Sequence, residues 1–140
     1  MNILCGLDSS YEGVVERSAP DPLRRSLGWC PQGDALFAHL TARETVELFD
    51  DLQCRHSLPS GEEGVAALER LGMGAHLDKE ARQLSGGMRR RLALALARAG
   101  DPLLLVLDEP SSGCDSATRE LVRREIVSLR SRCAVSPPSS

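Results

Sequence analysis

Leu84-Ser85-Gly86-Gly87-Met88 decides the fold of this chain, together with Leu103-Leu104-Leu105-Val106-Leu107-Asp108-Glu109-Pro110 further along. The first stretch precedes Leu92 to Ala97, where alternating Leu and Ala, both strong helix formers, favour a helix over a strand. The second is a run of aliphatic residues, apolar on both faces, that suits a buried parallel strand and ends in two carboxylates. A glycine loop, a helix and then a buried strand indicate an α/β fold.

Together these stretches resemble the ATP-binding cassette (ABC) ATPases, with Ser85-Gly86-Gly87 as the signature loop and Asp108-Glu109 at the end of the Walker B strand. Two further segments in the right order strengthen the resemblance. Cys30-Pro31-Gln32 looks like the Q-loop of that family, and Ser112-Gly113-Cys114-Asp115 resembles its D-loop, which is usually S-G-L-D. The resemblance covers most of Met1 to Leu129 and implies a partial P-loop NTPase domain with a helical subdomain.

One segment points to a subfamily. Residues 27–44 match the pattern L-G-x-C-P-Q-x-D-x-L-F-x-x-L-T-x-x-E, which is similar to the A subfamily of lipid-moving ABC transporters. Other parts of the family pattern are missing from the 140 residues. No G-x-x-x-x-G-K-[ST] phosphate loop (Walker A) occurs, and no switch histidine follows Glu109. We therefore expect the chain to be the middle of a nucleotide-binding domain, with Met1 an internal methionine of a longer protein.

The resemblance assigns the hydrolysis chemistry to three residues. Asp108 would help to hold Mg²⁺, Glu109 would orient or deprotonate the attacking water, and Gln32 would touch the metal or the water. Phosphoryl transfer needs little more from the protein than such positioning and charge stabilisation. A plainer interpretation of the carboxylates is a solvated pair in the turn before Pro110, and a lone glutamine is usually a surface residue.

The resemblance also assigns a nucleotide contact that acts in trans. Ser85, Gly86 and Gly87 would cap the γ-phosphate of ATP held by the phosphate loop of a facing cassette, and Asp115 would bridge the two cassettes. Glycines let a backbone approach closely, and amides at a helix N-terminus bind anions well. The plainer alternative is that Ser85 is an ordinary N-cap and that Asp115 is the N-cap of a helix over 116–129.

Composition excludes several other functions. The net charge of −3 gives no general attraction to nucleic acid, so we expect no nucleic-acid partner and interpret Arg89-Arg90-Arg91 as a solvated helix face. No apolar run approaches the roughly 20 residues of a membrane-spanning helix. Five cysteines at irregular spacing indicate reduced thiols rather than disulfides or a zinc site. The only lysine, Lys79, has no glycine loop before it.

We predict a domain over 1–130, with a helical subdomain at about 41–99, and a disordered Pro/Ser-rich tail over 131–140. Within it, the pattern predicts a strand over 27–30 and a helix that starts with a Thr41/Glu44 capping box. The remaining expectations are a helix end over 1–7, a short strand over 13–15, loops over 16–25 and 57–64, a helix over 65–71, and Val46, Phe49 and Leu52 on one helix face.

These features predict a fragment of the ATP-hydrolysing domain of an ABC transporter that moves lipid or another hydrophobic substrate. ATP and Mg²⁺ would be its cofactors, and its partners would be a second cassette and transmembrane domains that hold it at the cytoplasmic face of a membrane. Because the phosphate loop is missing, we expect the isolated chain to be inactive. An alternative is a short, catalytically dead protein that docks on an intact cassette as a regulator. A third hypothesis, a soluble ABC ATPase of translation or DNA repair, agrees less well with the Q-loop segment.

Overall fold

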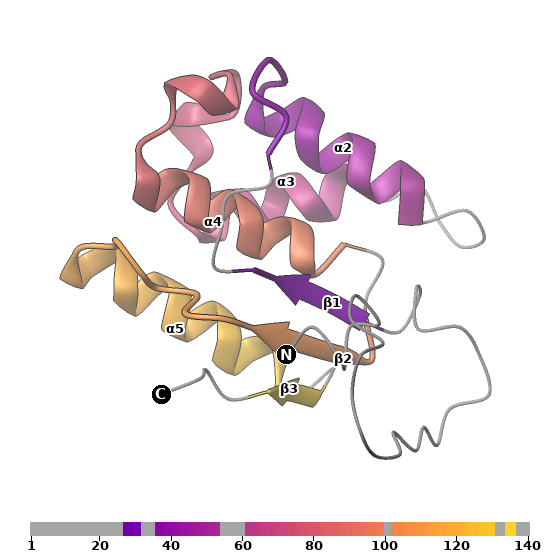
Figure 1. Cartoon of the computed structure of the whole chain (residues 1–140), viewed down its shortest axis with the longest axis vertical. Helices are drawn as coiled ribbons and strands as arrows, with labels where there is room; N and C mark the ends of the chain where they lie inside the picture. The colour runs from indigo at the N-terminus through magenta and orange to yellow at the C-terminus, as the bar shows by residue number, and fades with distance from the viewer. Residues whose placement is uncertain (1–26, 32–35, 54–60, 100–101, 131–133, 137–140) are drawn as a thin grey trace, which may run out of the picture.

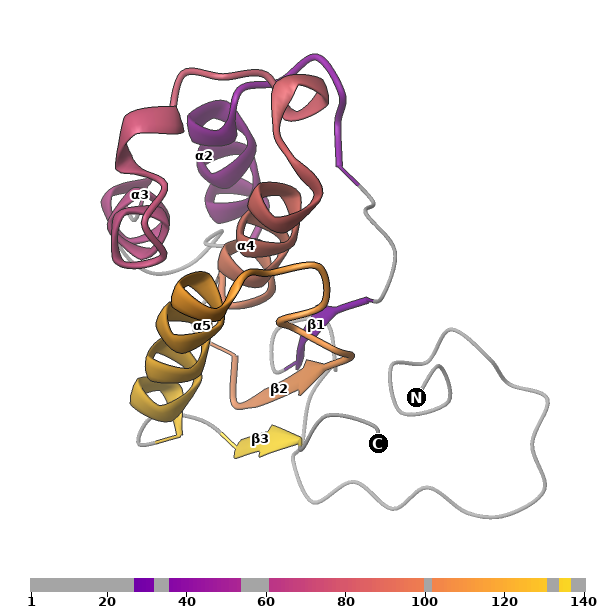
Figure 2. The same ribbon diagram turned by 90° about the vertical axis from the view of Figure 1, so that its left-hand side faces the viewer.

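The computed structural model describes residues 27–31, 36–53, 61–99, 102–130 and 134–136. It contains a three-stranded parallel sheet with helices packed around it, which confirms the α/β prediction. Figure 1 shows α2, α3 and α4 grouped on one side of the sheet, with α5 running beside it. In Figure 2, α4 lies between the other two helices of this group and the sheet. The sequence expectations over 1–25 and 54–60 lie outside the described residues.

The sheet has the order β1-β2-β3, and β2 is its central strand. Strand β1 (Leu27–Cys30) pairs in parallel with β2 (Leu104–Leu107), so that Cys30 faces Leu107 at the carboxyl ends of both strands. The amide of Asp108 donates to the carbonyl of Cys30 at 3.1 Å, which extends the ladder by one residue. The segments that follow the two strands therefore start side by side.

The end of the chain differs from the expected disordered tail. Residues Ala134–Ser136 form β3, which pairs in parallel with β2 in the register Leu104↔Ala134. Composition favoured disorder, but an open edge of β2 offers a row of backbone donors and acceptors, and such an edge readily pairs with an extended segment. Residues 137–140 lie outside the described residues.

Helix α2 (Ala42–Gln53) begins with the predicted capping box. The Thr41 amide donates to Glu44 Oε2 at 2.8 Å, and the Glu44 amide donates to Thr41 Oγ1 at 3.1 Å. These hydrogen bonds lower the pKa of the Glu44 carboxyl, so the capping contribution is full above its ordinary pKa and is lost as the pH falls through the lowered one. Val46 is buried and Phe49 half-buried, but Leu52 is 57% exposed and does not share the buried face predicted to contain all three.

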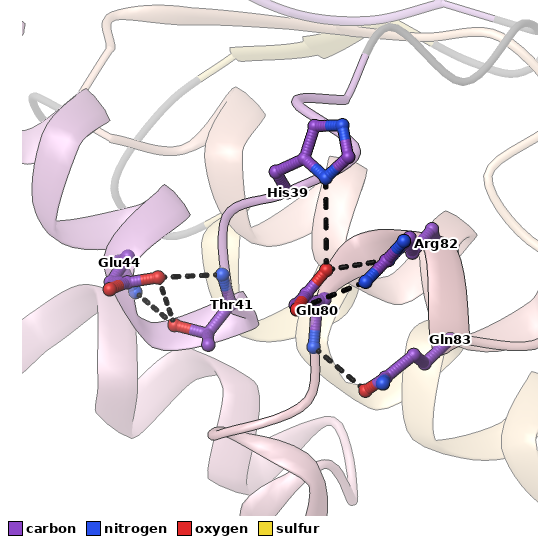
Figure 3. Close-up of polar contacts among 6 residues, drawn as sticks. All are labelled: His39, Thr41, Glu44, Glu80, Arg82 and Gln83. Carbon is purple, nitrogen blue, oxygen red and sulfur yellow. Dashed lines mark hydrogen bonds and ion pairs between the residues drawn. The ribbon is translucent and has the colours of Figure 1, made fainter.

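A second polar cluster ties the segment before the glycine loop to the start of α2 (Figure 3). Thr41 and Glu80 form an isolated antiparallel bridge, and Arg82 Nε donates to Glu80 Oε2 at 2.6 Å. The Glu80 amide donates to Gln83 Oε1 at 3.3 Å and completes a capping box at the short 3-10 helix η2 (Ala81–Gln83). Because Leu84 follows η2 directly, this cluster fixes the approach to the glycine loop.

Helix α3 (Gly61–Arg70) starts four residues earlier than predicted. The expected loop over 57–64 was inferred from its glycines, but Gly64 lies within the helix. Glycine is found there because Gly64 is where α3 contacts α2. A Cβ at Gly64 would lie 2.6 Å from Asp50 Oδ2 and 3.1 Å from Val46 Cβ of α2. Because Gly64 has no side chain, α2 and α3 can approach closely. A second glycine, Gly72, follows the end of α3 with φ of +72°, a conformation that favours glycine.

Helix α4 (Gly86–Ala97) is the centre of the core, and α5 (Ser116–Leu129) has the predicted bounds. The short 3-10 helix η1 (Gly74–His76) links α3 to η2. One apolar cluster joins the helices to the sheet through fully buried aliphatic side chains, chiefly Leu68, Leu71, Leu92, Leu94, Leu105, Leu107 and Val122. None of the described helices is long and apolar enough to span a membrane.

Candidate functional site

The candidate site lies at the carboxyl ends of β1 and β2, where ligands commonly bind in open α/β sheets. Pro31 follows β1, and Asp108 and Glu109 follow β2. These two segments lie side by side because Cys30 at the end of β1 is paired with Leu107 at the end of β2. Gln32 lies outside the described residues, so its predicted role stays a prediction. The sheet register alone thus brings the start of the Q-loop segment to Asp108, the predicted Mg²⁺ ligand, and Glu109, the predicted catalytic residue.

Asp108 is half-buried, whereas Glu109 is exposed to solvent. Strand alternation does not produce this difference, because β2 ends at Leu107 and both carboxylates lie beyond it. Glu109 instead adopts φ of +46°, a left-handed conformation that costs a non-glycine residue of order 1–3 kcal/mol. Its carbonyl accepts two hydrogen bonds at 3.0 Å, from the Ser112 amide and from Arg90 Nε. These bonds hold the strained turn in place.

The glycine loop opens α4 as predicted. Ser85 is the N-cap, and its hydroxyl oxygen accepts from the Met88 amide at 3.3 Å, which confirms the plainer interpretation of that serine. A Cβ on Gly87 would lie 3.2 Å from the carbonyl oxygen of Gly113, so packing explains this glycine. A Cβ on Gly86 would meet nothing within 4 Å. The fold therefore does not require glycine at 86, and open space lies beside the first amides of the helix.

The segment resembling a D-loop packs against the glycine loop and starts α5. The Thr118 amide donates to Asp115 Oδ1 at 2.7 Å, which confirms Asp115 as the N-cap and lowers the pKa of its carboxyl. Cys114 is buried at the leucine position of the usual motif, and burial raises the pKa of its thiol. The predicted contact of Asp115 with a facing cassette stays a prediction.

The interpretation of Arg89-Arg90-Arg91 as a solvated face is wrong, because Arg90 is buried and Arg89 and Arg91 are half-buried. Arg90 is only 3% exposed and donates to the carbonyls of Glu109 and Pro31. Arg91 is half-buried and donates to the carbonyl of Leu71 at 2.8 Å. Composition could not distinguish Arg90 and Arg91 from solvated side chains, because each of them bonds a backbone carbonyl 19 or more residues away in sequence.

The sequence of residues 1–112 matches the profile of the ABC transporter family. This chain belongs to that family. Rat ATP-binding cassette sub-family A member 7 is 40% identical over 127 residues, which cover 88% of this chain and 6% of the relative. The human retinal-specific phospholipid-transporting ATPase ABCA4 is 36% identical over 137 residues, which cover 94% of this chain and 6% of the relative.

A solved structure also matches this ABC cassette segment. The dimeric structure described as a bacterial ABC transporter cassette, MJ0796, superimposes with a TM-score of 0.75 at 26% identity and covers 84% of this chain. The chain spans 53% of that cassette and 6% of the curated relatives above. These matches confirm the predicted family and the partial cassette fold.

The cassette segment has a hollow of about 780 Å³ beside Glu109 and along α5. Hydroxyl groups of the turn after β2 and guanidinium groups of α5 line it together with apolar side chains of the core. The lining residues are Leu107, Glu109, Pro110, Ser111, Ser112, Gly113, Ser116, Arg119, Glu120, Val122, Arg123, Ile126 and Arg130. Among the residues that the structure describes, no group of three or more potential metal ligands is assembled.

Proposed function

We propose that this chain forms part of the nucleotide-binding domain of an A-subfamily ABC transporter, in which ATP hydrolysis powers movement of a lipid or another hydrophobic substrate. The observation that carries the proposal is the pairing of Cys30 with Leu107, because it brings the Q-loop segment and the two carboxylates to one edge of a parallel sheet. The relatives whose names include phospholipid transport support the substrate class.

The surroundings of the carboxylates support the roles that the resemblance assigns to them. Asp108 and Gln32 would hold Mg²⁺, since carboxylate and amide oxygens suit this hard cation and Asp108 is fixed at the strand end by its amide. Mg²⁺ would supply charge neutralisation for the phosphates of ATP. Glu109 is exposed and held by its carbonyl, so its carboxylate is free to orient or deprotonate the attacking water.

The glycine loop would act on ATP bound elsewhere. Open space at Gly86 lies beside the N-terminus of α4, where backbone amides would contact an anion. The cassette MJ0796 is dimeric, which supports a facing cassette as the partner for Ser85, Gly86, Gly87 and Asp115. Transmembrane domains would be the further partners and would place the cassette at the cytoplasmic face of a membrane.

A regulatory role is the second candidate. The 140 residues contain the loop predicted to act in trans and no G-x-x-x-x-G-K-[ST] motif that would act in cis. Such a chain could dock on an intact cassette and modulate it without hydrolysing ATP. In both cases we expect the chain alone to bind ATP weakly, because backbone amides of the phosphate loop supply the main contacts to the phosphates.

A chimera tests the catalytic assignment. The chain is joined to the phosphate-loop segment of an A-subfamily cassette, and ATP hydrolysis is measured for Glu109→Gln and for the exposed control Glu47→Gln. We expect Glu109→Gln to lower kcat by about 10²–10⁴-fold, as for loss of a general base, while ATP is still bound. Glu47→Gln should hydrolyse like the parent chimera. If Glu109→Gln also does so, Glu109 does not act on water.

A further inference from the structure

Arg90 connects three segments of the cassette through one buried side chain. It projects from α4, three residues after Gly87, and is only 3% exposed. Its Nε donates to the carbonyl oxygen of Glu109 at 3.0 Å, and its Nη1 donates to the carbonyl oxygen of Pro31. Its Nη2 is buried without a hydrogen-bond partner among the described residues.

The partners of Arg90 are unusual for a buried cation. A buried charge is costly and is normally paired with an opposite charge. Within the described ranges Arg90 instead meets two backbone carbonyls and no carboxylate. Hydrogen bonds from a charged donor are stronger than neutral ones, and the rigid guanidinium fork fixes the relative positions of the two carbonyls it contacts. This geometry indicates that the Arg90 side chain orients the backbone at Pro31 and Glu109.

Both carbonyls belong to segments that carry predicted catalytic residues. Glu109 is the predicted water-activating residue and has the strained left-handed φ of +46°. Pro31 directly precedes Gln32 in the Q-loop segment. A second hydrogen bond to the Glu109 carbonyl comes from the Ser112 amide, but that bond is local to the turn. The bond from Arg90, by contrast, ties the turn to α4.

We infer that Arg90 is a positioning residue: it holds Glu109 in its left-handed conformation and aligns the segment leading to Gln32 against it. The same helix begins with Ser85, Gly86 and Gly87, so Arg90 also links the loop that acts in trans to the hydrolysis residues. The catalytic meaning of this inference rests on the proposed function, whereas the conformational claim about Glu109 does not.

Arg91 offers a matched comparison on the same helix. It is the next residue, it is also partly buried, and it also donates to backbone carbonyls, at 2.8 Å to Leu71 and 3.3 Å to Gly87. Outside α4 it contacts Leu71, directly after α3, and not the carboxyl end of the sheet. An identical substitution at 90 and at 91 should therefore disturb different segments.

The experiment compares the full chain with Arg90→Met, Arg90→Lys and Arg91→Met, without nucleotide. NMR scalar couplings give the φ of Glu109, and hydrogen exchange reports the amides of Asp108, Ser112, Gly72 and Met73. For Arg90→Met we expect exchange at Asp108 and Ser112 to accelerate roughly tenfold or more, and φ of Glu109 to become negative. Arg91→Met should instead accelerate Gly72 and Met73 and leave Glu109 unchanged.

Arg90→Lys keeps the charge but presents a point donor that reaches one carbonyl at a time, so we expect partial rescue. The inference is overturned if Arg90→Met and Arg90→Lys leave the φ of Glu109 and the protection of Ser112 unchanged. It is also overturned if all four amides accelerate equally, because that pattern means general destabilisation. Inactivity of the chimera described above would contradict the proposed function alone.

Discussion

Gly28→Ala is expected to destabilise the chain by at least about 3 kcal/mol, the upper part of the range for forcing extra volume into a packed core. A Cβ at Gly28 would lie 1.8 Å from the carbonyl oxygen of Ala97 and 2.9 Å from both Leu105 Cδ1 and Pro102 Cγ. The oxygen belongs to the backbone at the end of α4 and cannot rotate away. Relief of this clash requires β1 or α4 to move. Chemical denaturation of the full chain measures the resulting loss in the free energy of unfolding.

Gly86→Ala is the matched control for that substitution. A Cβ at Gly86 would meet nothing within 4 Å, and alanine favours a helix over glycine by about 1 kcal/mol. We expect the free energy of unfolding to stay unchanged or rise. A Gly28→Ala variant as stable as Gly86→Ala would contradict the packing of β1 against α4 described above.

Glu125→Ala is expected to lower the free energy of unfolding by roughly 3–5 kcal/mol, the range for removing one partner of a buried ion pair. Glu125 is 5% exposed on α5 and accepts from Arg98 Nη1 at 2.7 Å and from Arg70 Nε at 3.1 Å. Arg98 is 8% exposed at the end of α4, and Arg70 ends α3. The carboxylate therefore ties two helices of the group near the signature loop to α5.

Two further variants test this assignment by thermal and chemical unfolding. Glu120 lies on the same helix with exposed partners Arg123 and Arg124, so Glu120→Ala should change the unfolding midpoint little. The double variant Glu125→Leu with Arg98→Met replaces charges by apolar groups and should recover much of the loss, because it leaves no buried charge without its partner. Equal losses for Glu120→Ala and Glu125→Ala would contradict a buried ion pair between Glu125 and Arg98.

Elements with local signals could be predicted from the sequence. Asp115 and Ser85 cap the helices that follow them, and the Thr41/Glu44 capping box starts α2. The aliphatic run before Asp108 forms the buried central strand. In each case the hydrogen-bonding groups or the apolar residues lie within a few positions of one another, so the local sequence is sufficient to predict the element.

Features that depend on distant partners could not be predicted in this way. Gly64 suggested a loop, but it lies in α3 and permits close contact with α2. Strand β3 forms because its backbone pairs with the edge of β2. Arg90 resembled a solvated side chain because nothing in its neighbourhood identifies the carbonyls of Pro31 and Glu109 as partners. For the site, the family resemblance assigned Gln32 and Asp108 to one metal ion, while the left-handed turn at Glu109 came from the structure alone.

The central claim is that Ser85, Gly86 and Gly87 contact ATP held by a facing cassette, and one trans-complementation assay tests it most directly. The partner is an intact A-subfamily cassette whose own signature-loop serine is replaced by arginine, so that its phosphate loop works and its signature loop does not. We predict that adding this chain restores ATP hydrolysis by the partner and that Ser85→Arg in this chain abolishes the restoration. Equal restoration by both chains, or none by the unaltered one, would contradict the account.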